Sequence, residues 1–446
     1  MCLLVFFKQN FMRIKTGASE ISIILIIIVM TIISSNINWG KERWRGILEA
    51  DAKGYYAYLP AVFIYNDLNF RFFDTIEKGK YYDSNLYYDY RAYANGKAID
   101  KYYAGTAVAQ MPFFLMAHAL SMVSDNEADG YSAYYPVFVN IAAIFYLFVG
   151  LVFINRSLKL FFIRDKIRAL VLFAAVFGTN LFYYTIGEPG MSHVFSFAFI
   201  SAFFYYSKLY FVSFEIKYVP LMAFLLGMIV LIRPVNGLIV FIIPFVAGDF
   251  FSLRKGFHDF TRKPGFLSGS LIIFLGLISI QLIIYRISTG SFVVYSYTGE
   301  GFNFLKPHFF EILLSFKKGL FIYTPIYLLS FTGCLFLWKS SRFQFYAWLL
   351  FFILITFIFS SWSNWYYGGS FSSRVYVEYI PVFMALLAMA LQNFSKKAPK
   401  AILTGAVFFF IVLCQIQTYQ YRYYQIHWSD MNRQKYLEVF MRLDKL

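Results

Sequence analysis

Residues 134–154 read YYPVFVNIAAIFYLFVGLVFI, a run of 21 residues without a charged side chain. About 20 apolar residues in a helix cross the hydrocarbon core of a bilayer. Similar runs recur along the chain, in which 59% of the 446 residues are hydrophobic and 14% are charged. Soluble domains are about half apolar and about a quarter charged. The sequence therefore predicts an all-α polytopic membrane protein.

Eleven segments are expected to span the membrane: 21–38, 134–154, 168–187, 191–212, 218–233, 235–250, 266–286, 320–338, 343–361, 375–392 and 400–418. Cytoplasmic loops carry an excess of Lys and Arg. In this chain, six basic regions fall on the same side of the eleven spans: Lys8 to Lys15, Arg156 to Arg168, Lys208 with Lys217, Arg254 to Lys263, Lys339 with Arg342, and Lys396 to Lys400. If the weaker apolar stretch 104–123 also crossed, every later basic loop would change sides. We therefore expect that stretch to lie on the membrane surface, with a cytoplasmic N-terminus and an outer C-terminus.

The net charge of +16 is explained by these loops, which face anionic lipid headgroups, so nucleic acid is not expected as a partner. The remaining polar segments are expected outside: a long first outer loop at 39–133 with juxtamembrane helices, shorter loops at 288–318 and 362–374, and a tail at 419–446. There is no internal repeat and no separate soluble domain. Residues 1–446 are expected to form a single membrane domain.

Two outer segments carry acids. The stretch Glu49 to Pro60 holds Asp51 and Lys53 just after the first span, among many tyrosines. A carboxylate at the membrane interface can serve as a general base, although a solvated loop Asp is the simpler alternative. The turn Gly187 to His193 places Glu188 and His193 next to Pro and Gly, which hold a short turn in place. These two side chains could equally mark helix ends.

Two further outer segments carry arginine. Arg233 lies between two apolar runs, where a cation needs an anion, water or a headgroup; snorkelling to the headgroups is the alternative. The stretch Trp362 to Arg374 combines Trp365 with Gly368 and Gly369, which permit close approach of the backbone. Arg374 could bind a phosphate in a bidentate manner. Trp365 could stack on a sugar or belong to an aromatic belt.

At these positions the chain resembles the GT-C superfamily of membrane glycosyltransferases, which includes protein O-mannosyltransferases and the lipid A aminoarabinose transferases. The resemblance covers the order of spans and loops, with Asp51 at the position of the early acid in the first outer loop. Lys101 to Thr106 is similar to a Lys-Tyr-Pro-Pro-Gly-Thr segment, with Tyr103 and Ala104 in place of both prolines. Glu188-Pro189, Leu231 to Pro234 and Trp365 to Arg374 are similar to three further motifs.

The resemblance implies a transferase that takes a sugar from a polyprenyl-phosphate donor and passes it to a glycan, lipid or protein acceptor. Asp51 would deprotonate the acceptor hydroxyl, and Arg374 with Arg233 or Lys101 would stabilise the departing phosphate. Glu188, His193, Lys53 and Trp365 complete the expected set of donor- or acceptor-binding residues. One Glu and one His fall short of a metal site, so no metal or other cofactor is predicted.

Two other functions share these features. A polysaccharide polymerase or ligase would also have many spans, a large outer loop and outer arginines. A lipid or solute transporter would usually have charged residues near the middle of the bilayer and repeated halves. Here the charges lie at the ends of spans, which favours the enzyme. The expected location is the bacterial inner membrane, with the active site on the periplasmic side.

Overall fold

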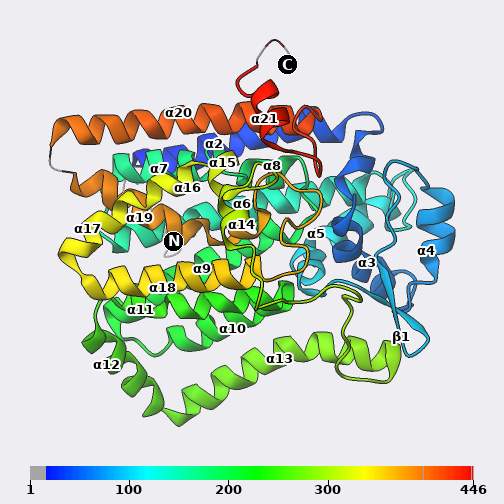
Figure 1. Ribbon diagram of the computed structural model, residues 1–446. Helices are drawn as coiled ribbons and strands as arrows, with labels where there is room; N and C mark the ends of the chain where they lie inside the picture. Colours follow the sequence, from blue (N-terminus) through cyan, green and yellow to red (C-terminus); the bar gives the residue numbers. More distant parts are fainter. Residues whose placement is uncertain (1–16, 395, 443, 445–446) are drawn as a thin grey trace, which may run out of the picture.

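The computed structural model describes residues 17–394, 396–442 and 444 (Figure 1). The basic residues Lys8, Arg13 and Lys15, which helped to predict the orientation, lie outside this part of the chain. Among the described residues, helices dominate and the strands form a single small hairpin. The protein is an all-α integral membrane protein, as the apolar runs predict.

Seven helices in the described part are long and apolar enough to cross a membrane, and each coincides with a predicted span. They are α2 (Ala18–Ser34) with the π-turn η1 (Ser35–Trp39), α6 (Tyr134–Leu160), α9 (Ser192–Ser213), α13 (Pro264–Thr289), α18 (Arg342–Ser360), η5 (Arg374–Tyr379) with α19 (Ile380–Asn393), and α20 (Lys397–Arg422). The η5–α19 segment forms the centre of the bundle, since 94% of its apolar window is buried. In α13 only 11% is buried, so this helix lies at the edge.

The other four predicted spans are shorter or interrupted, so the structure does not confirm a count of eleven. They correspond to α7 (Asp165–Phe177) with α8 (Leu181–Ile186), α10 (Tyr218–Ile232), η4 (Pro234–Ile242) with α11 (Ile243–Ala247), and α15 (Leu320–Tyr323) with α16 (Ile326–Ser330) and α17 (Thr332–Ser340). Pro325 separates α15 from α16 because it has no N–H to continue the helix. Between α7 and α8, the Thr179 hydroxyl accepts a hydrogen bond from the Leu181 N–H at 3.2 Å and replaces a backbone carbonyl.

The first outer loop contains the expected helices and also a hairpin that was not expected. Its helices are η2 (Arg43–Ile47), α3 (Asp51–Phe63), α4 (Phe72–Thr75), η3 (Ile76–Lys80) and α5 (Gly105–Met122). Strands β1 (Arg91–Ala94) and β2 (Lys97–Asp100) pair antiparallel. Asn95 and Gly96 form the turn with φ of 53° and 74°, which fits the Asn-Gly preference of tight hairpins. Helix α5, predicted to lie at the surface, packs against α3, α6 and α10 and is not one of the seven long apolar helices.

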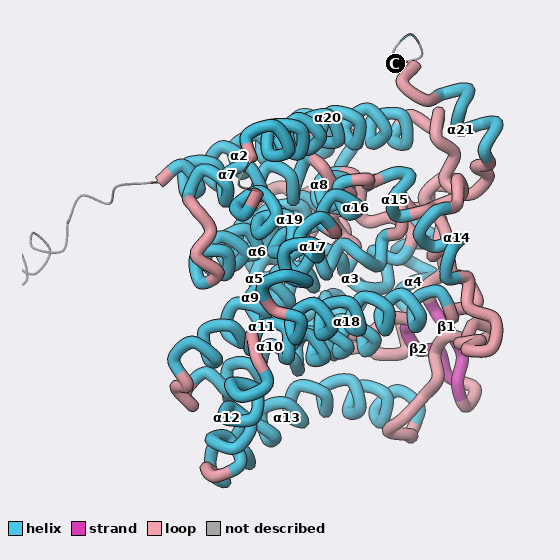
Figure 2. Tube along the Cα trace, turned by 60° about the vertical axis from the view of Figure 1, so that its left-hand side comes forward, coloured by secondary structure: helices cyan, strands magenta, loops and turns pink. Residues whose placement is uncertain are grey.

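The remaining elements are α12 (Phe250–Thr261), α14 (Phe309–Leu314) and α21 (Arg433–Val439). Both views show that the first outer loop, the hairpin and the C-terminal tail gather at one end of the helix bundle (Figures 1 and 2). In both, the tail lies at the upper edge of this end, and the hairpin lies below it. The polar segments that the sequence places outside the membrane therefore meet, although they lie far apart in the chain.

Candidate active site

A cavity of about 1740 Å³ opens at this loop-rich end of the bundle. Six of the eight residues predicted to form the site line it: Asp51, Lys101, Glu188, His193, Arg233 and Arg374. They come from the first outer loop, from the turn before α9 together with the first turn of α9, from the junction of α10 with η4, and from the start of η5. The tertiary structure thus brings four separate polar segments to one wall.

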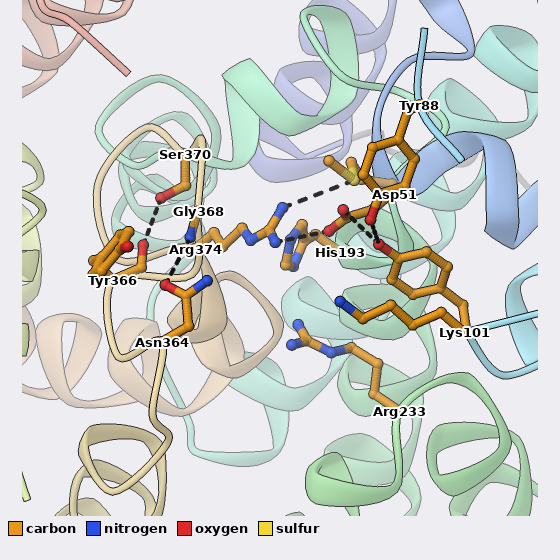
Figure 3. A network of polar contacts seen from close by, with 12 residues as sticks. Asp51, Tyr88, Lys101, His193, Arg233, Asn364, Tyr366, Gly368, Ser370 and Arg374 are labelled. Atoms are coloured by element: carbon orange, nitrogen blue, oxygen red, sulfur yellow. Dashed lines mark hydrogen bonds and ion pairs between the residues drawn. The ribbon is translucent and has the colours of Figure 1, made fainter. Parts of the chain in front are cut away.

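Asp51 and Arg374 form an ion pair at the centre of this wall (Figure 3). Arg374 Nη2 donates to Asp51 Oδ2 at 2.8 Å, and the side chains are 13% and 19% exposed, so the pair remains reachable from the cavity. The Tyr102 hydroxyl donates to Asp51 Oδ1 at 2.7 Å, and the Tyr88 hydroxyl lies 2.6 Å from that of Tyr102. Arg374 Nη1 also lies 4.0 Å from Met191 Sδ. The carboxylate therefore has a fixed orientation.

Local backbone geometry presents Asp51 to the cavity. Asp51 is the first residue of α3, where a negative charge is stabilised by the helix dipole. The preceding Ala50 has φ 47° and ψ −130°, a conformation that residues with a Cβ rarely adopt. Such strained residues are concentrated at functional sites, because the surrounding structure must hold them in place. The chain bends sharply at Ala50 and enters α3 with its first carboxylate facing the cavity.

The charge of Asp51 is set by two opposing effects. Burial raises the pKa of Asp51, but the Arg374 guanidinium and the Tyr102 hydrogen bond outweigh burial and hold the pKa below its usual value. Asp51 is therefore ionised at neutral pH and can accept a proton once a substrate displaces Arg374.

Two glycines allow the polar segments to touch. A Cβ on Gly105, at the start of α5, would lie 2.3 Å from the backbone nitrogen of Ile232. A Cβ on Gly190 would lie 2.7 Å from Cβ of Ala52. The first contact joins the segment of Lys101 to that of Arg233, and the second joins the turn of Glu188 to the start of α3. Glycine is required at both positions because real Cβ atoms do not approach so closely.

Glu378 anchors two of the predicted site residues and was not itself predicted. Its Oε1 accepts from His193 Nδ1 at 2.9 Å and from Arg233 Nη1 at 3.0 Å, while its own side chain is completely buried. The sequence did carry a signal, since Glu378 is an acid within the apolar run 375–392, and such residues are costly unless paired. Glu378 fixes the direction in which Arg233 enters the cavity.

Lys101 extends toward the same space as Arg233 (Figure 3). Its Nζ donates to Glu300 Oε1 at 2.8 Å and lies 5.0 Å from the ring centroid of Tyr297. Glu300 is also bonded by the Trp362 indole at 3.1 Å. The three cations Lys101, Arg233 and Arg374 thus reach one cavity from three elements, each held by a carboxylate.

Two acids form a second region of the cavity wall. Burial and the nearby Glu49 carboxylate raise the pKa of Glu188 to about 8. Burial likewise raises the pKa of Glu49 to about 7, although Arg422 lowers it. The Tyr183 hydroxyl donates to Glu188 Oε1 at 3.1 Å, and among the described residues Oε2 of Glu188 has no hydrogen-bond partner. At neutral pH, Glu188 is mostly protonated, whereas Asp51 is ionised.

Hydrogen bonds from Lys318 and within the loop hold the loop 362–374, which ends at Arg374. The buried ammonium of Lys318 donates to the carbonyl of Ser370, and burial lowers the pKa of this lysine to about 7. The Ser370 hydroxyl donates to the Tyr366 carbonyl at 3.2 Å, and the Gly368 N–H donates to Asn364 Oδ1 at 3.3 Å (Figure 3). These hydrogen bonds fix the loop, and the part that Lys318 takes in them was not predicted.

Lys53 and Trp365 do not line the cavity. Lys53 follows Asp51 by two residues in α3, which turns its side chain away by about 200°. Its Nζ lies 3.6 Å from Oε2 of the buried Glu77 instead. The Trp365 ring stacks on His308 with centroids 5.4 Å apart, and the cavity is lined by Trp362 in its place.

Within the described residues, no group of three or more His, Cys, Asp and Glu side chains could hold a metal ion. Among the acids that line the cavity, Asp51 and Glu300 are paired with cations, and Glu49 lies near Glu188.

No protein-family model matches the chain, and no curated protein matches it in sequence. Among solved structures, the chain is similar to the oligosaccharyltransferase of Archaeoglobus fulgidus, in a crystal structure of its complex with zinc and sulfate. The two are 11% identical with a TM-score of 0.45, and the match covers 94% of this chain and 54% of the other. The chain thus spans about half the length of that protein. A likeness of this degree does not identify a reaction.

Proposed function

We propose that this protein is a membrane glycosyltransferase that moves a sugar from a polyprenyl-phosphate donor to a hydroxyl group of a glycan, lipid or protein acceptor. One observation carries the proposal: an ionised carboxylate, Asp51, lies 2.8 Å from Arg374 in a cavity that Lys101 and Arg233 also enter. A base beside a cluster of cations suits a reaction in which a proton leaves one substrate and a phosphate leaves the other.

The cations suit the phosphate of the donor. Arg374 and Arg233 present planar guanidinium groups, which bind phosphate oxygens in pairs, and Lys101 adds a point charge. The cavity lies at the end of an apolar helix bundle, so a lipid phosphate at the headgroup level can reach the cations while its polyprenyl chain stays in the membrane. A soluble nucleotide sugar would gain nothing from this position.

The reaction is a direct displacement at the anomeric carbon. The acceptor oxygen forms a bond to this carbon, and the bond between the carbon and the phosphate oxygen breaks. The acceptor proton passes to Asp51, and the electron pair leaves with polyprenyl phosphate. When the donor phosphate binds Arg374, Asp51 loses part of its bond to this arginine, so its pKa rises and it becomes a better base. Arg374 thereby links donor binding to proton transfer.

The remaining polar groups position the substrates. Glu188 is protonated at neutral pH and can donate a hydrogen bond to a sugar hydroxyl, while His193 stays bonded to Glu378. No step of the proposal uses a metal. We place the reaction on the periplasmic side of a bacterial inner membrane, since the basic loops face the opposite side under the charge rule.

Transfer by the purified full-length protein in nanodiscs would test the proposal, with a panel of polyprenyl-phosphate sugars, polyprenyl-pyrophosphate oligosaccharides and nucleotide sugars. Release of polyprenyl phosphate should require Asp51. It should survive in Asp125→Asn, which removes an exposed acid of the same loop that does not line the cavity. Turnover only with oligosaccharide donors would point to a polymerase or ligase. Neither turnover nor binding in a folded sample would overturn the proposal and favour a transporter.

A further inference from the structure

The C-terminal tail forms one side of the cavity, and its most prominent side chain there is Trp428. Residues 421–424 and Trp428 all line the cavity, and the Trp428 side chain is 47% exposed. A Cβ added to Gly369 would lie 3.4 Å from the Trp428 ring, so this glycine lies close to the ring. The ring of His427 stacks beside it at 5.4 Å. Trp428 therefore presents an aromatic surface to the cavity.

The tail is held on both sides of Trp428. Ile426 and Met431, which flank it, are buried. Further on, the Tyr436 hydroxyl of α21 accepts from Gln417 Nε2 of α20 at 2.8 Å. The Trp428 indole is half exposed, and the buried residues on either side of it hold it in position to contact a ligand in the cavity. An aromatic belt would explain a tryptophan that faces lipid, but Trp428 faces the cavity of the proposed active site.

Two groups of charged side chains line the cavity, and the acidic group also has a cation, Arg422, whose charge lowers the pKa of Glu49. Lys101 follows the hairpin and Arg233 ends α10, whereas Glu49 and Glu188 are connected to the tail. The connection runs from Glu188 to the Tyr183 hydroxyl, and from the Tyr183 ring to Tyr421 with centroids 5.0 Å apart. The hairpin and the tail lie at opposite edges of the loop-rich end (Figures 1 and 2).

This layout matters because a displacement needs its two partners on opposite sides of the reacting carbon. The phosphate leaves on the side of the cations. The acceptor must then approach from the side of Glu49, Glu188 and Trp428. Sugars are bound by aromatic rings against their apolar faces and by carboxyl groups on their hydroxyls, and this side offers both. Glu188 lines this side of the cavity, and its buried Oε2 has no hydrogen-bond partner among the described residues.

Resting on the proposed transferase function, we propose that the tail side of the cavity is a carbohydrate-binding acceptor subsite in which Trp428 stacks on a sugar ring and Glu49 and Glu188 bind its hydroxyls. The acceptor class is therefore a glycan. A polypeptide hydroxyl would need no flat aromatic surface, and a lipid acceptor would enter from the membrane rather than along the tail.

Binding to the full-length protein in nanodiscs tests this subsite without turnover. The probes are neutral oligosaccharides of glucose, mannose and N-acetylglucosamine, read by saturation-transfer NMR, and undecaprenyl phosphate is measured separately. Trp428→Leu should weaken the binding of whichever oligosaccharide the wild type binds by about tenfold, because one aromatic stacking contact is lost. Trp428→Phe should weaken it less. Trp338→Leu, at the end of α17, changes a tryptophan of similar exposure (43%) that does not line the cavity, and should bind like wild type.

Undecaprenyl phosphate should bind equally to all of these variants. Wild-type oligosaccharide affinity in Trp428→Leu would overturn the subsite. The subsite would also be overturned if the protein bound undecaprenyl phosphate but none of the oligosaccharides in the panel. The same conclusion would follow if the only ligand whose binding depended on Trp428 were a peptide that contains serine and threonine. If Trp428→Leu does not fold, unchanged affinity in Trp428→Phe overturns it. Oligosaccharide binding through Trp428 without any binding of undecaprenyl phosphate would refute the transferase function while the carbohydrate site stands.

Discussion

Replacing Asp51 by asparagine keeps the size of the side chain and an acceptor for the Tyr102 hydroxyl. It removes the negative charge that lies 2.8 Å from Arg374 Nη2. If Asp51 is the general base, the rate of transfer should fall by about 10²- to 10⁴-fold, the usual contribution of such a group. The same change should make the protein bind polyprenyl phosphate more tightly, because Asp51 competes with this anion for Arg374.

The gain in binding can be worked out from the charges. A phosphate bound to Arg374 would lie about 5 Å from the Asp51 carboxylate, where two unit charges at an effective dielectric constant of about 20 repel by about 3 kcal/mol. Asp51 is 19% exposed and the cavity is open, so solvent screens part of this repulsion. We expect about 1 to 2 kcal/mol to remain, which corresponds to binding of undecaprenyl phosphate about 5- to 30-fold tighter.

Both quantities can be measured on the same purified sample: release of polyprenyl phosphate by a radiolabelled or mass-spectrometric assay, and the affinity for undecaprenyl phosphate by native mass spectrometry. Arg374→Gln is the complementary variant and should lose both transfer and binding. Asp125→Asn should change neither. Weaker binding together with lost activity in Asp51→Asn would show that Asp51 supports the fold of the cavity and would refute its assignment as the base.

Three further outcomes follow from the structure. Gly105→Ala should lower the midpoint of thermal unfolding and transfer activity together, since its Cβ would lie 2.3 Å from the Ile232 nitrogen and overpacking costs about 1 to 3 kcal/mol; a stability equal to wild type would refute the contact. The pKa of Glu188 is raised to about 8, so the native state holds a proton that the unfolded chain loses near pH 4.5. Stability should then fall as the pH rises from about 4.5 to 8, and Glu188→Gln should flatten this fall in thermal unfolding scans between pH 5 and 8. Glu378→Gln should raise the KM for the donor by about tenfold with a smaller change in kcat, because Arg233 loses a charged hydrogen bond; an unchanged KM would show that Arg233 does not bind the donor.

The sequence determined the class of fold because a bilayer imposes a length and a composition on every segment that crosses it. The seven long apolar helices fall where the apolar runs predict them. The interruptions at Thr179 and Pro325 were harder to predict, because a buried bundle can satisfy the backbone groups that a break exposes. The β-hairpin of the first outer loop was missed, although its Asn95-Gly96 turn is a recognisable local signal.

The candidate residues were largely determined by residue type, and their partners only by packing. Charged side chains are few beside the apolar runs on the predicted outer side, and this made Asp51, Arg233 and Arg374 visible in the sequence. Nothing in the sequence pairs Asp51 with Arg374, which is 323 residues away. Nor could it show that Lys53 turns away to Glu77, since this depends on how α3 is oriented.

The amino-acid sequence by itself thus determined that the protein lies in a membrane and which polar segments lie together outside the apolar runs. Only the tertiary structure decided which of their side chains meet. The physical reason is one of distance. Whether a segment can cross the membrane depends only on the apolar residues within that segment, whereas an ion pair needs atoms of two distant segments within about 4 Å. Such an approach depends on close contacts between distant backbones, here those made possible by Gly105 and Gly190.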